Sequence, residues 1–340
     1  MFSKRKIGII GLGMVGEPIR RWFEEIMGYK RGETLFCYDV DQAKNYSDDI
    51  NRADIIFLAV PTSQNLDGSC DTSVVEGVLK TIPAGKTVVI KSTVVPGTTQ
   101  KLQNKYKDKK IIFSPEFFTE AKAWSSFINP DRQIVGHTTL SSSDVDEIVS
   151  LLPKAEFTRP KTINNTEKNV NSTEAELAKY GVNVFGYMKV VYGNVLADIC
   201  EAVSIKFNYE DVPLVVDYDK IREIISADKR IGEAWLDVGY DNYCGVGGRC
   251  FPKDMNAFVV FVKDLLKFLK EKEKEKKINK GLINALKRGI AILEAVVLYN
   301  RELLKWQGLS AKEVMKYDKE KIIRKRKPIR MIKRSNLSSL

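Results

Sequence analysis

The stretch KIGIIGLGMVG, from Lys6 to Gly16, decides the fold of the first half of this chain. It opens with a short apolar run of the kind that forms a buried strand, and the pattern after it is helical as far as Met27. Between strand and helix stands GxGxxG, with glycines at positions 11, 13 and 16. A strand, a glycine-rich turn and a helix in this order are typical of a dinucleotide-binding βαβ unit.

Each glycine of this turn has its own physical use. Gly11 allows the tight turn, Gly13 lets a pyrophosphate approach the backbone, and Gly16 lets the helix pack closely on the strand. Backbone N–H groups at the helix start, in which Met14 and Val15 lie, would then meet the phosphate charge. We therefore expect these five residues to bind the cofactor. A glycine turn that binds no nucleotide is the alternative.

An acidic residue follows the next expected strand. That strand covers Thr34–Tyr38 and ends at Asp39, close to the distance from the last glycine that is usual in such units. A carboxylate at this place accepts hydrogen bonds from the ribose hydroxyls of NAD and would repel the additional phosphate of NADP. The sequence therefore predicts NAD as the cofactor.

Strands and helices continue to alternate after Asp39. Further strands are expected at 54–60, 87–91, 110–113 and 133–136, and helices at 73–79 and 98–105. This alternation predicts an α/β fold with a Rossmann-like, doubly wound parallel sheet. The segment between Asp39 and Asp54 is short for a full crossover helix. The loops 61–71, 92–99 and 114–123 fall at the carboxyl edge of the sheet, where ligands bind in this architecture.

The second half of the chain is mainly helical. A long helix without proline is expected at 174–204, and on it Lys179 and Asn183 lie four positions apart and so share a face. A glycine-rich loop then leads into the sequence CFPKD, in which Pro252 suits the first turn of a helix. The expected segments are an NAD-binding domain at 1–171, a long central helix at 172–208, a helical substrate and catalytic domain at 209–310, and a basic tail at 311–340.

Length and composition exclude several classes of protein. The chain has 340 residues, of which 44% are hydrophobic, so it can bury a core in each of two domains. It shows no apolar run long enough to span a membrane and no secretory signal at its start, and we expect a cytoplasmic protein. The five cysteines are scattered without CxxC and there is one histidine, so neither a disulfide framework nor a metal site is expected. We expect that histidine, His137, to be a surface or a hydrogen-bonded residue rather than a catalytic base.

The positive charge is concentrated at the C-terminus. The formal net charge is +11, and residues 321–340 hold eight basic side chains and no acidic one. The body of the chain is therefore close to neutral. Such a tail could contact nucleic acid or an anionic surface, but a solvated end is the favoured interpretation.

At this point the motifs, in their order, resemble the UDP-glucose/GDP-mannose dehydrogenase family. They span about three quarters of the chain, from position 6 to about 260, and CFPKD after the glycine-rich loop is the most specific. The matching pieces are GLGMVG, FLAVPTS, KSTVVPGTT, SPEFFTEAKA, NPDRQIVG, ELAKYGVNVF, DKRIG and GVGGRCFPKD. CFPKD favours the UDP-glucose branch of the family.

The resemblance implies a four-electron oxidation. Family members convert the C6 alcohol of a nucleotide sugar to a carboxylate and use two NAD per turnover. With UDP-glucose as the substrate, the product would be UDP-glucuronate. The second oxidation needs a covalent handle on the carbon, and a thiol supplies it through a thiohemiacetal and then a thioester. The residue that matches the family nucleophile is Cys250. A buried structural cysteine is its alternative reading.

The remaining site residues are carried over by the same resemblance. The family lysine and asparagine that stabilise the oxyanion match Lys179 and Asn183, and the aspartate that orients water matches Asp254. The carboxylate that helps to hydrolyse the thioester matches Glu120, Glu116 lies nearer the water and substrate, and Thr93 contacts water and cofactor. Further cofactor contacts are expected at Val60, Pro61 and Thr62. Further substrate contacts are expected at Phe117, Arg230, Gly247 and Lys253.

Two departures and two alternatives accompany this reading. Family members carry a further C-terminal domain that binds the nucleotide sugar, whereas the sequence after Asn300 is too short for one, so we expect that domain to be missing. The connection after the second strand is also short. A relative of the 3-hydroxyacid dehydrogenases would share Lys179 and Asn183 but would not need Cys250. A non-catalytic NAD-binding or interaction protein is the other alternative. In the family reading, a homodimer forms through the central helix.

Overall fold

The computed structural model describes most of the chain and divides it into two compact units. The described residues are 5–118, 122–159, 169–239, 243–273 and 279–316. We call Met1–Leu66 with Cys70–Gly181 the N-terminal unit, and Asp67–Ser69 with Val182–Leu340 the C-terminal unit.

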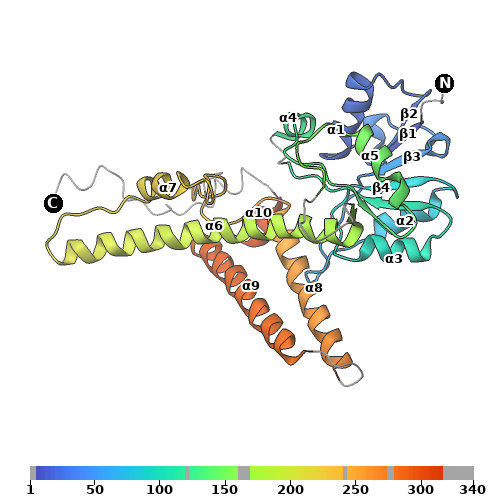
Figure 1. Ribbon diagram of the computed structural model, residues 1–340. Helices are drawn as coiled ribbons and strands as arrows, with labels where there is room; N and C mark the ends of the chain where they lie inside the picture. Colours follow the sequence, from blue (N-terminus) through green and yellow to red (C-terminus); the bar gives the residue numbers. More distant parts are fainter. Residues whose placement is uncertain (1–4, 119–121, 160–168, 240–242, 274–278, 317–340) are drawn as a thin grey trace. The chain divides into compact units, whose positions relative to one another are not determined.

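A seven-stranded sheet forms the centre of the N-terminal unit (Figure 1). The strands are β1 Ile7–Ile10, β2 Leu35–Tyr38, β3 Ile55–Leu58, β4 Thr87–Ile90, β5 Lys110–Phe113, β6 Gly136–His137 and β7 Val170–Asn171. Their order in the sheet is β2-β1-β3-β4-β5-β6-β7. Strands β1 to β5 are parallel, β6 is antiparallel to β5, and β7 is parallel to β6. The predicted doubly wound α/β sheet is therefore confirmed, but it is only mostly parallel, because β6 runs against β5. The loops after β1, β3, β4 and β5 share its carboxyl edge.

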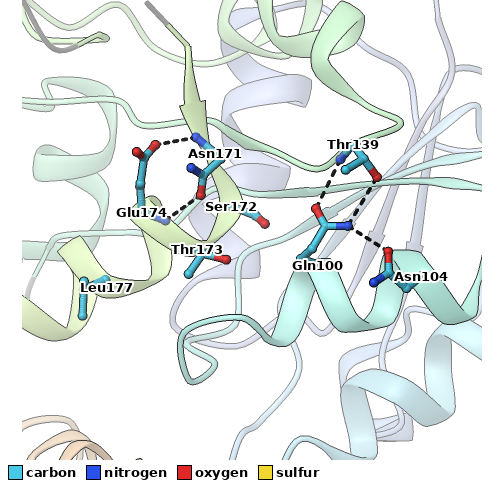
Figure 2. A pocket seen from close by; sticks show the side chains of 8 residues that line it. All are labelled: Gln100, Asn104, Thr139, Asn171, Ser172, Thr173, Glu174 and Leu177. Atoms are coloured by element: carbon cyan, nitrogen blue, oxygen red, sulfur yellow. Dashed lines mark hydrogen bonds between the residues drawn. The ribbon is translucent and has the colours of Figure 1, made fainter. Parts of the chain in front are cut away.

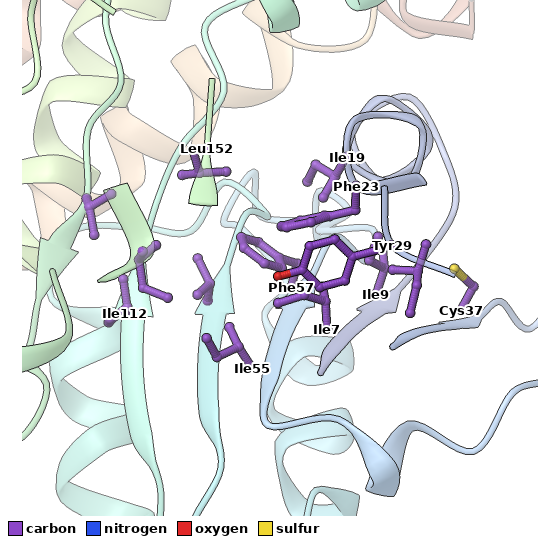
Figure 3. Packing of buried hydrophobic residues seen from close by; sticks show 14 of the residues in the cluster. Ile7, Ile9, Ile19, Phe23, Tyr29, Cys37, Ile55, Phe57, Ile112 and Leu152 are labelled. Atoms are coloured by element: carbon purple, nitrogen blue, oxygen red, sulfur yellow. The ribbon is translucent and has the colours of Figure 1, made fainter. Parts of the chain in front are cut away.

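Helices cover both faces of this sheet. They are α1 Gly16–Arg21 with the π-helical turn Trp22–Ile26, α2 Ser73–Thr81, α3 Thr98–Lys105, α4 Ala123–Ile128 and α5 Val145–Leu151. Alternate strand residues such as Ile7, Ile9 and Phe57 pack with Ile19 and Phe23 on one face (Figure 3). Their neighbours along the strands pack against α2 and α3 on the other face. Both faces are buried because side chains alternate along a strand, and this explains why the strands are continuously apolar.

The connection from β2 to β3 contains two 3-10 turns, Gln42–Lys44 and Ile50–Arg52, in place of an α-helix. The prediction that the segment between Asp39 and Asp54 is too short for a crossover helix is thus confirmed. The predicted strand at 133–136 is wrong in its bounds, since β6 begins at Gly136. Ile134 and Val135 are buried and give a strand-like apolar run, but the recorded strand pairing with β5 starts only after them.

Helices form most of the described part of the C-terminal unit. The predicted long helix is present as α6 Ser172–Tyr209, which begins in the N-terminal unit and continues into this one. The others are α7 Tyr218–Ser226, α8 Phe251–Lys272, α9 Lys280–Trp306 and α10 Ala311–Lys316. Val184 and Tyr187 of α6 share a buried cluster with Met255 and Val259 of α8. Most of the predicted basic tail, from residue 317 on, lies outside the described residues. Within the described part of the chain, no helix combines the length and apolar character that crossing a membrane requires.

Candidate active site

The glycine-rich turn between β1 and α1 has the geometry that each of its glycines was expected to need. Gly11 has φ of +88°, and a Cβ there would lie 2.5 Å from the carbonyl oxygen of Ala59. A Cβ on Gly16 would lie 1.8 Å from the carbonyl oxygen of Gly11. A Cβ on Gly13, in contrast, would meet no atom of the described chain within 4 Å. The protein leaves space at Gly13, and this space fits a cofactor pyrophosphate close to the backbone.

Asp39 follows β2 and is connected directly to this turn. Its Oδ2 accepts hydrogen bonds from the backbone N–H of Leu12 at 2.7 Å and from Lys44 Nζ at 2.9 Å. Its Oδ1 accepts from the N–H of Asp41 at 2.9 Å. Burial acts to raise the pKa of Asp39, but these hydrogen bonds prevail and hold it below its ordinary value. The carboxylate is therefore charged at neutral pH, as recognition of ribose hydroxyls requires.

Lys44 was not among the predicted site residues. Its ammonium donates to Asp39 and also to the carbonyl oxygen of Leu12 at 3.1 Å, so it bridges the acid and the glycine-rich turn. Its signal in the sequence is weak, because it is one lysine within a short polar connection. Lys44 and Asp39 thus connect the segment after β2 to the glycine-rich turn.

The remaining predicted cofactor residues follow β3 and β4. Val60, Pro61 and Thr62 come directly after β3, and Ser92 donates its hydroxyl to the carbonyl oxygen of Val60 at 2.7 Å. Thr93, one residue further on, is half-buried. Since β3 and β4 are parallel neighbours, these residues meet at the same carboxyl edge.

A buried ion pair lies where β4 and β5 end. The ammonium of Lys91, which is fully buried, contacts the carboxylate of Glu116 and donates to the hydroxyl of Ser114 at 3.0 Å. A buried charge needs such a partner, because an unpaired one would lose its hydration without compensation. The predicted catalytic Glu116 is therefore held in place by a lysine that the sequence analysis did not single out. Glu120 lies outside the described residues.

Phe117 and Lys179, both predicted to contact substrate, are in contact with each other. Lys179 Nζ lies 5.4 Å from the centre of the Phe117 ring, and the guanidinium carbon of Arg132 lies 4.2 Å from it. A ring that attracts two cations keeps both near the carboxyl edge of the sheet. The structure thus brings two positive charges to the loop that carries Glu116, a setting that suits an anionic ligand.

In the C-terminal unit, three predicted residues meet at the start of α8. Asn183 donates its side-chain amide to Asp254 Oδ2 at 2.5 Å, and Lys253 Nζ donates to Oδ1 at 2.6 Å. Asp254 is 1% exposed, so these contacts replace the water that its carboxylate loses. Pro252 stands in the first turn of the helix, as predicted.

Cys250 occupies the N-cap position of this helix and is exposed. Its carbonyl oxygen accepts the N–H of Asp254 at 2.9 Å, which places the thiol one turn before the buried carboxylate. The N-terminus of a helix favours a negative charge and hence a thiolate. An exposed position contradicts the alternative that Cys250 is a buried structural cysteine.

Side chains of α9 and of the turn after it hold the glycine-rich loop that precedes Cys250. Asn300 accepts the N–H of Val246 at 2.6 Å and donates to its carbonyl oxygen at 3.1 Å, and Gln307 makes the same pair of bonds with Cys244 at 2.8 and 2.9 Å. A Cβ on the predicted Gly247 would lie 1.8 Å from the hydroxyl of Tyr243. The loop is thus fixed by distant residues that the sequence analysis missed.

Two other residues singled out in the sequence lie apart from these clusters. The side chain of Arg230 is 90% exposed and pairs with Asp228 at 2.6 Å, two positions away. Nδ1 of His137 lies 3.0 Å from the carbonyl oxygen of Thr138. The histidine is half-buried and hydrogen-bonded to its own strand end.

A pocket of about 600 Å³ opens in the N-terminal unit at the start of α6 (Figure 2). Its lining consists of Gln100, Asn104, Thr139, Asn171, Ser172, Thr173, Glu174 and Leu177. Gln100 donates its side-chain amide to Asn104 and Thr139, and the Glu174 carboxylate accepts the backbone N–H of Asn171. The lining includes none of the predicted site residues.

Two sequence profiles of one known family match this chain. The NAD binding domain of the UDP-glucose/GDP-mannose dehydrogenase family matches residues 41–152, and its central domain matches residues 173–281. Together they cover more than half of the chain. The chain belongs to the UDP-glucose/GDP-mannose dehydrogenase family. Because the first match is the family's NAD binding domain, the prediction of NAD as the cofactor is confirmed.

Relatives with known names agree with this assignment. A UDP-glucose 6-dehydrogenase of Rhizobium meliloti is 34% identical over 304 residues, which cover 76% of this chain and 64% of that protein. One from Rickettsia bellii is 30% identical and covers 64% of this chain and 47% of that protein. The chain thus spans between about half and two thirds of the length of these relatives. A UDP-glucose dehydrogenase structure from Pyrobaculum islandicum shares the fold, with a TM-score of 0.66, 23% identity, and coverage of 90% of this chain and 70% of that one.

Proposed function

We propose that this protein oxidises UDP-glucose to UDP-glucuronate with two NAD per turnover, through a thioester on Cys250. The observation that carries the proposal is the cluster at the start of α8. There Asn183 and Lys253 hold a buried Asp254 one turn beyond an exposed thiol. A structural helix start would need neither the exposed thiol nor a buried carboxylate with two side-chain donors.

Each step of the reaction requires a particular side chain of the protein. The first oxidation removes a hydride from C6 and a proton from its hydroxyl, and leaves an aldehyde. The thiolate of Cys250 adds to that aldehyde and gives a thiohemiacetal, whose oxygen carries negative charge until it is protonated. The ammonium of Lys179 and the amide of Asn183 are suited to stabilise this oxyanion, because both donate hydrogen bonds.

The second oxidation removes a hydride from the thiohemiacetal carbon and a proton from its hydroxyl, which leaves a thioester. Water then adds to the thioester carbonyl, the carbon–sulfur bond breaks, and the thiolate is regenerated beside the carboxylate product. In this step Asp254 and the carboxylates of Glu116 and Glu120 are proposed to orient the water and accept its proton. Bound NAD supplies the hydride acceptor for both oxidations.

The groups that would bind the ligands are divided between the two units. In the N-terminal unit, Gly13 and Asp39 support binding of NAD, and the Lys179 and Arg132 cations around Phe117 support binding of an anionic sugar nucleotide. In the C-terminal unit, Gly247 and Arg230 are proposed to contact substrate. Arg230 is the more accessible of the two, since its side chain is almost fully exposed.

We also propose that the protein forms a homodimer through α6. Along this helix, three apolar residues follow one another at intervals of seven: Phe185, Tyr192 and Ile199, which are 61%, 57% and 52% exposed. Residues seven apart share a helix face, so the helix presents an apolar stripe to solvent. Sedimentation velocity of the full chain tests this proposal: a dimer that Phe185→Glu converts to a monomer would support it, and a monomeric wild-type chain would contradict it.

The thioester is tested by replacing Cys250 with serine. We expect Cys250→Ser to abolish release of the carboxylate product and to retain NAD binding, because the oxygen is a poor substitute for the thiolate. Cys200→Ala is the matched control, since it removes a buried thiol of α6 away from the start of α8. The acid is quantified by chromatography with UDP-glucose as substrate. Undiminished acid formation by Cys250→Ser would contradict the mechanism.

A further inference from the structure

Glu176, on the first turns of α6, carries a carboxylate that is fully buried in the N-terminal unit. Its Oε2 accepts the backbone N–H of Gly97 at 2.5 Å, and its Oε1 accepts the N–H of Thr99 at 2.8 Å. These two N–H groups lie at the start of α3. One carboxylate therefore closes a contact between two segments that are almost 80 positions apart in the chain.

This contact replaces a local helix cap. The residue at the N-cap of α3 is Gly97, which has φ of +90° and no side chain with which to accept a hydrogen bond. A serine or an aspartate at a cap would satisfy these N–H groups locally and close to water. The chain instead uses a buried carboxylate, and burial raises its pKa to about 7 even though both N–H groups and the charge of Lys101 act to lower it.

The position of Glu176 relates it to the candidate active site. The loop that runs from Ser92 to Gly97 carries Thr93, so the bond to Gly97 fixes the far end of that loop. On α6, Lys179 follows Glu176 after three positions and lies on the neighbouring part of the same face. Movement of the carboxylate would therefore shift the Thr93 loop relative to the turn that carries Lys179.

We propose that Glu176 is a positioning residue, whose buried carboxylate pins the Thr93 loop to the turn of α6 that bears Lys179. The catalytic part of this inference rests on the proposed function. The structural part, which we call the pin, is the contact of Glu176 with Gly97 and Thr99. It does not rest on the proposed function, because it lies within the N-terminal unit and can be measured without substrate.

Because opening of the loop is linked to ionisation of Glu176, the stability of this contact should depend on pH in a way that can be measured. If opening of the loop exposes Glu176 to water, its pKa falls toward its ordinary value, so opening releases a proton. Opening must then become easier as the pH rises through the range in which the closed carboxyl ionises. Between pH 6 and pH 8 the protection of the Gly97 and Thr99 amides should fall about tenfold. The positive charge of Lys101 acts on this carboxylate and favours its ionised form.

Hydrogen exchange of the full chain tests the pin. We expect Glu176→Gln to raise exchange of the Gly97 and Thr99 amides about tenfold at pH 7, because an amide nitrogen cannot accept the second N–H. The variant should also lose the pH dependence of their protection, with the rates divided by the intrinsic exchange rates. Glu174→Gln is the matched control, since Glu174 bonds locally to Asn171 at the start of α6. Equal exchange in wild type and Glu176→Gln would overturn the proposal.

Kinetics test the catalytic part. With UDP-glucose and NAD, Glu176→Gln should lower kcat about tenfold or more while KM for UDP-glucose changes less than about threefold, because misplaced groups impair the transition state more than binding. Altered exchange with an unchanged kcat would overturn the positioning role.

If the wild type forms no NADH from any nucleotide sugar, the proposed function fails, and the exchange measurement still decides whether Glu176 holds the Thr93 loop. If Glu176→Gln does not fold, pH-independent protection of the two amides in wild type would overturn the proposal.

Discussion

Two glycine-rich segments, residues 11–16 and 245–248, use glycine for opposite reasons. In the first, a side chain on Gly16 would collide with the backbone of the same turn, and Gly13 faces open space. In the second, Gly245 is crowded by the side chain of Asn300 from α9, and Gly247 by the side chain of Tyr243, four positions before it. The first turn is crowded by backbone atoms, of the turn itself at Gly16 and of Ala59 at Gly11, whereas the second is crowded by side chains of the C-terminal unit. Substitutions can separate these two cases.

The largest effect is expected within the first turn. We expect Gly16→Ala to destabilise the N-terminal unit by at least about 4 kcal/mol, because its Cβ would lie 1.8 Å from a backbone oxygen that cannot move independently. Gly13→Ala should change the free energy of unfolding by less than about 1 kcal/mol, since its Cβ would meet no atom of the described residues within 4 Å, but it should abolish NAD binding. Thermal unfolding and calorimetric titration with NAD measure both. Equal stability of the two variants would remove the distinction between them.

An intermediate effect is expected where α9 holds the second loop. Asn300→Ala removes two hydrogen bonds to Val246 from a residue that is 3% exposed, and it leaves both backbone groups without that partner. We expect a loss of about 2–3 kcal/mol in the free energy of unfolding. Asn284→Ala, an exposed position on the same helix, is the control and should be nearly neutral. If both variants unfold at the same denaturant concentration, Asn300 does not fix this loop.

The smallest effect is expected at Gly248. This residue has φ of +74°, but a Cβ there would meet no atom of the described chain within 4 Å. Gly248→Ala should therefore cost only the backbone strain of a left-handed alanine, about 1 kcal/mol. Denaturant unfolding measures this difference. A loss as large as that of Asn300→Ala would indicate that crowding, and not backbone conformation alone, selects glycine there.

Local patterns predicted the parts of the molecule that depend on neighbouring residues. The GxGxxG turn and Asp39 follow from short spacings along the chain, and the alternation of strands and helices indicated the parallel sheet. The predicted start of strand β6, at 133, was wrong, because the buried residues Ile134 and Val135 give the same apolar pattern as a strand. An apolar run does not distinguish paired backbone from packed loop.

Long-range contacts supplied what the sequence alone could not. One contact decides the role of each of three residues, Lys91, Glu176 and Asn300. Lys91 pairs with Glu116, which follows the neighbouring strand β5, and the other two residues bond to backbone groups 50 or more positions away in the sequence. No periodicity marks such residues, because only the folded chain brings their partners near. The residues carried over from the family resemblance gained neighbours in the structure, but their roles stay predictions.

The measurement that tests the central claim most directly is the amount of NADH formed for each UDP-glucose consumed by the purified chain. Two NADH per sugar, with UDP-glucuronate as the product, is the result that a Cys250 thioester and two hydride transfers predict. One NADH per sugar would mean that oxidation stops at the aldehyde. No NADH, with NAD still bound, would contradict the proposal that this chain is by itself a nucleotide-sugar dehydrogenase.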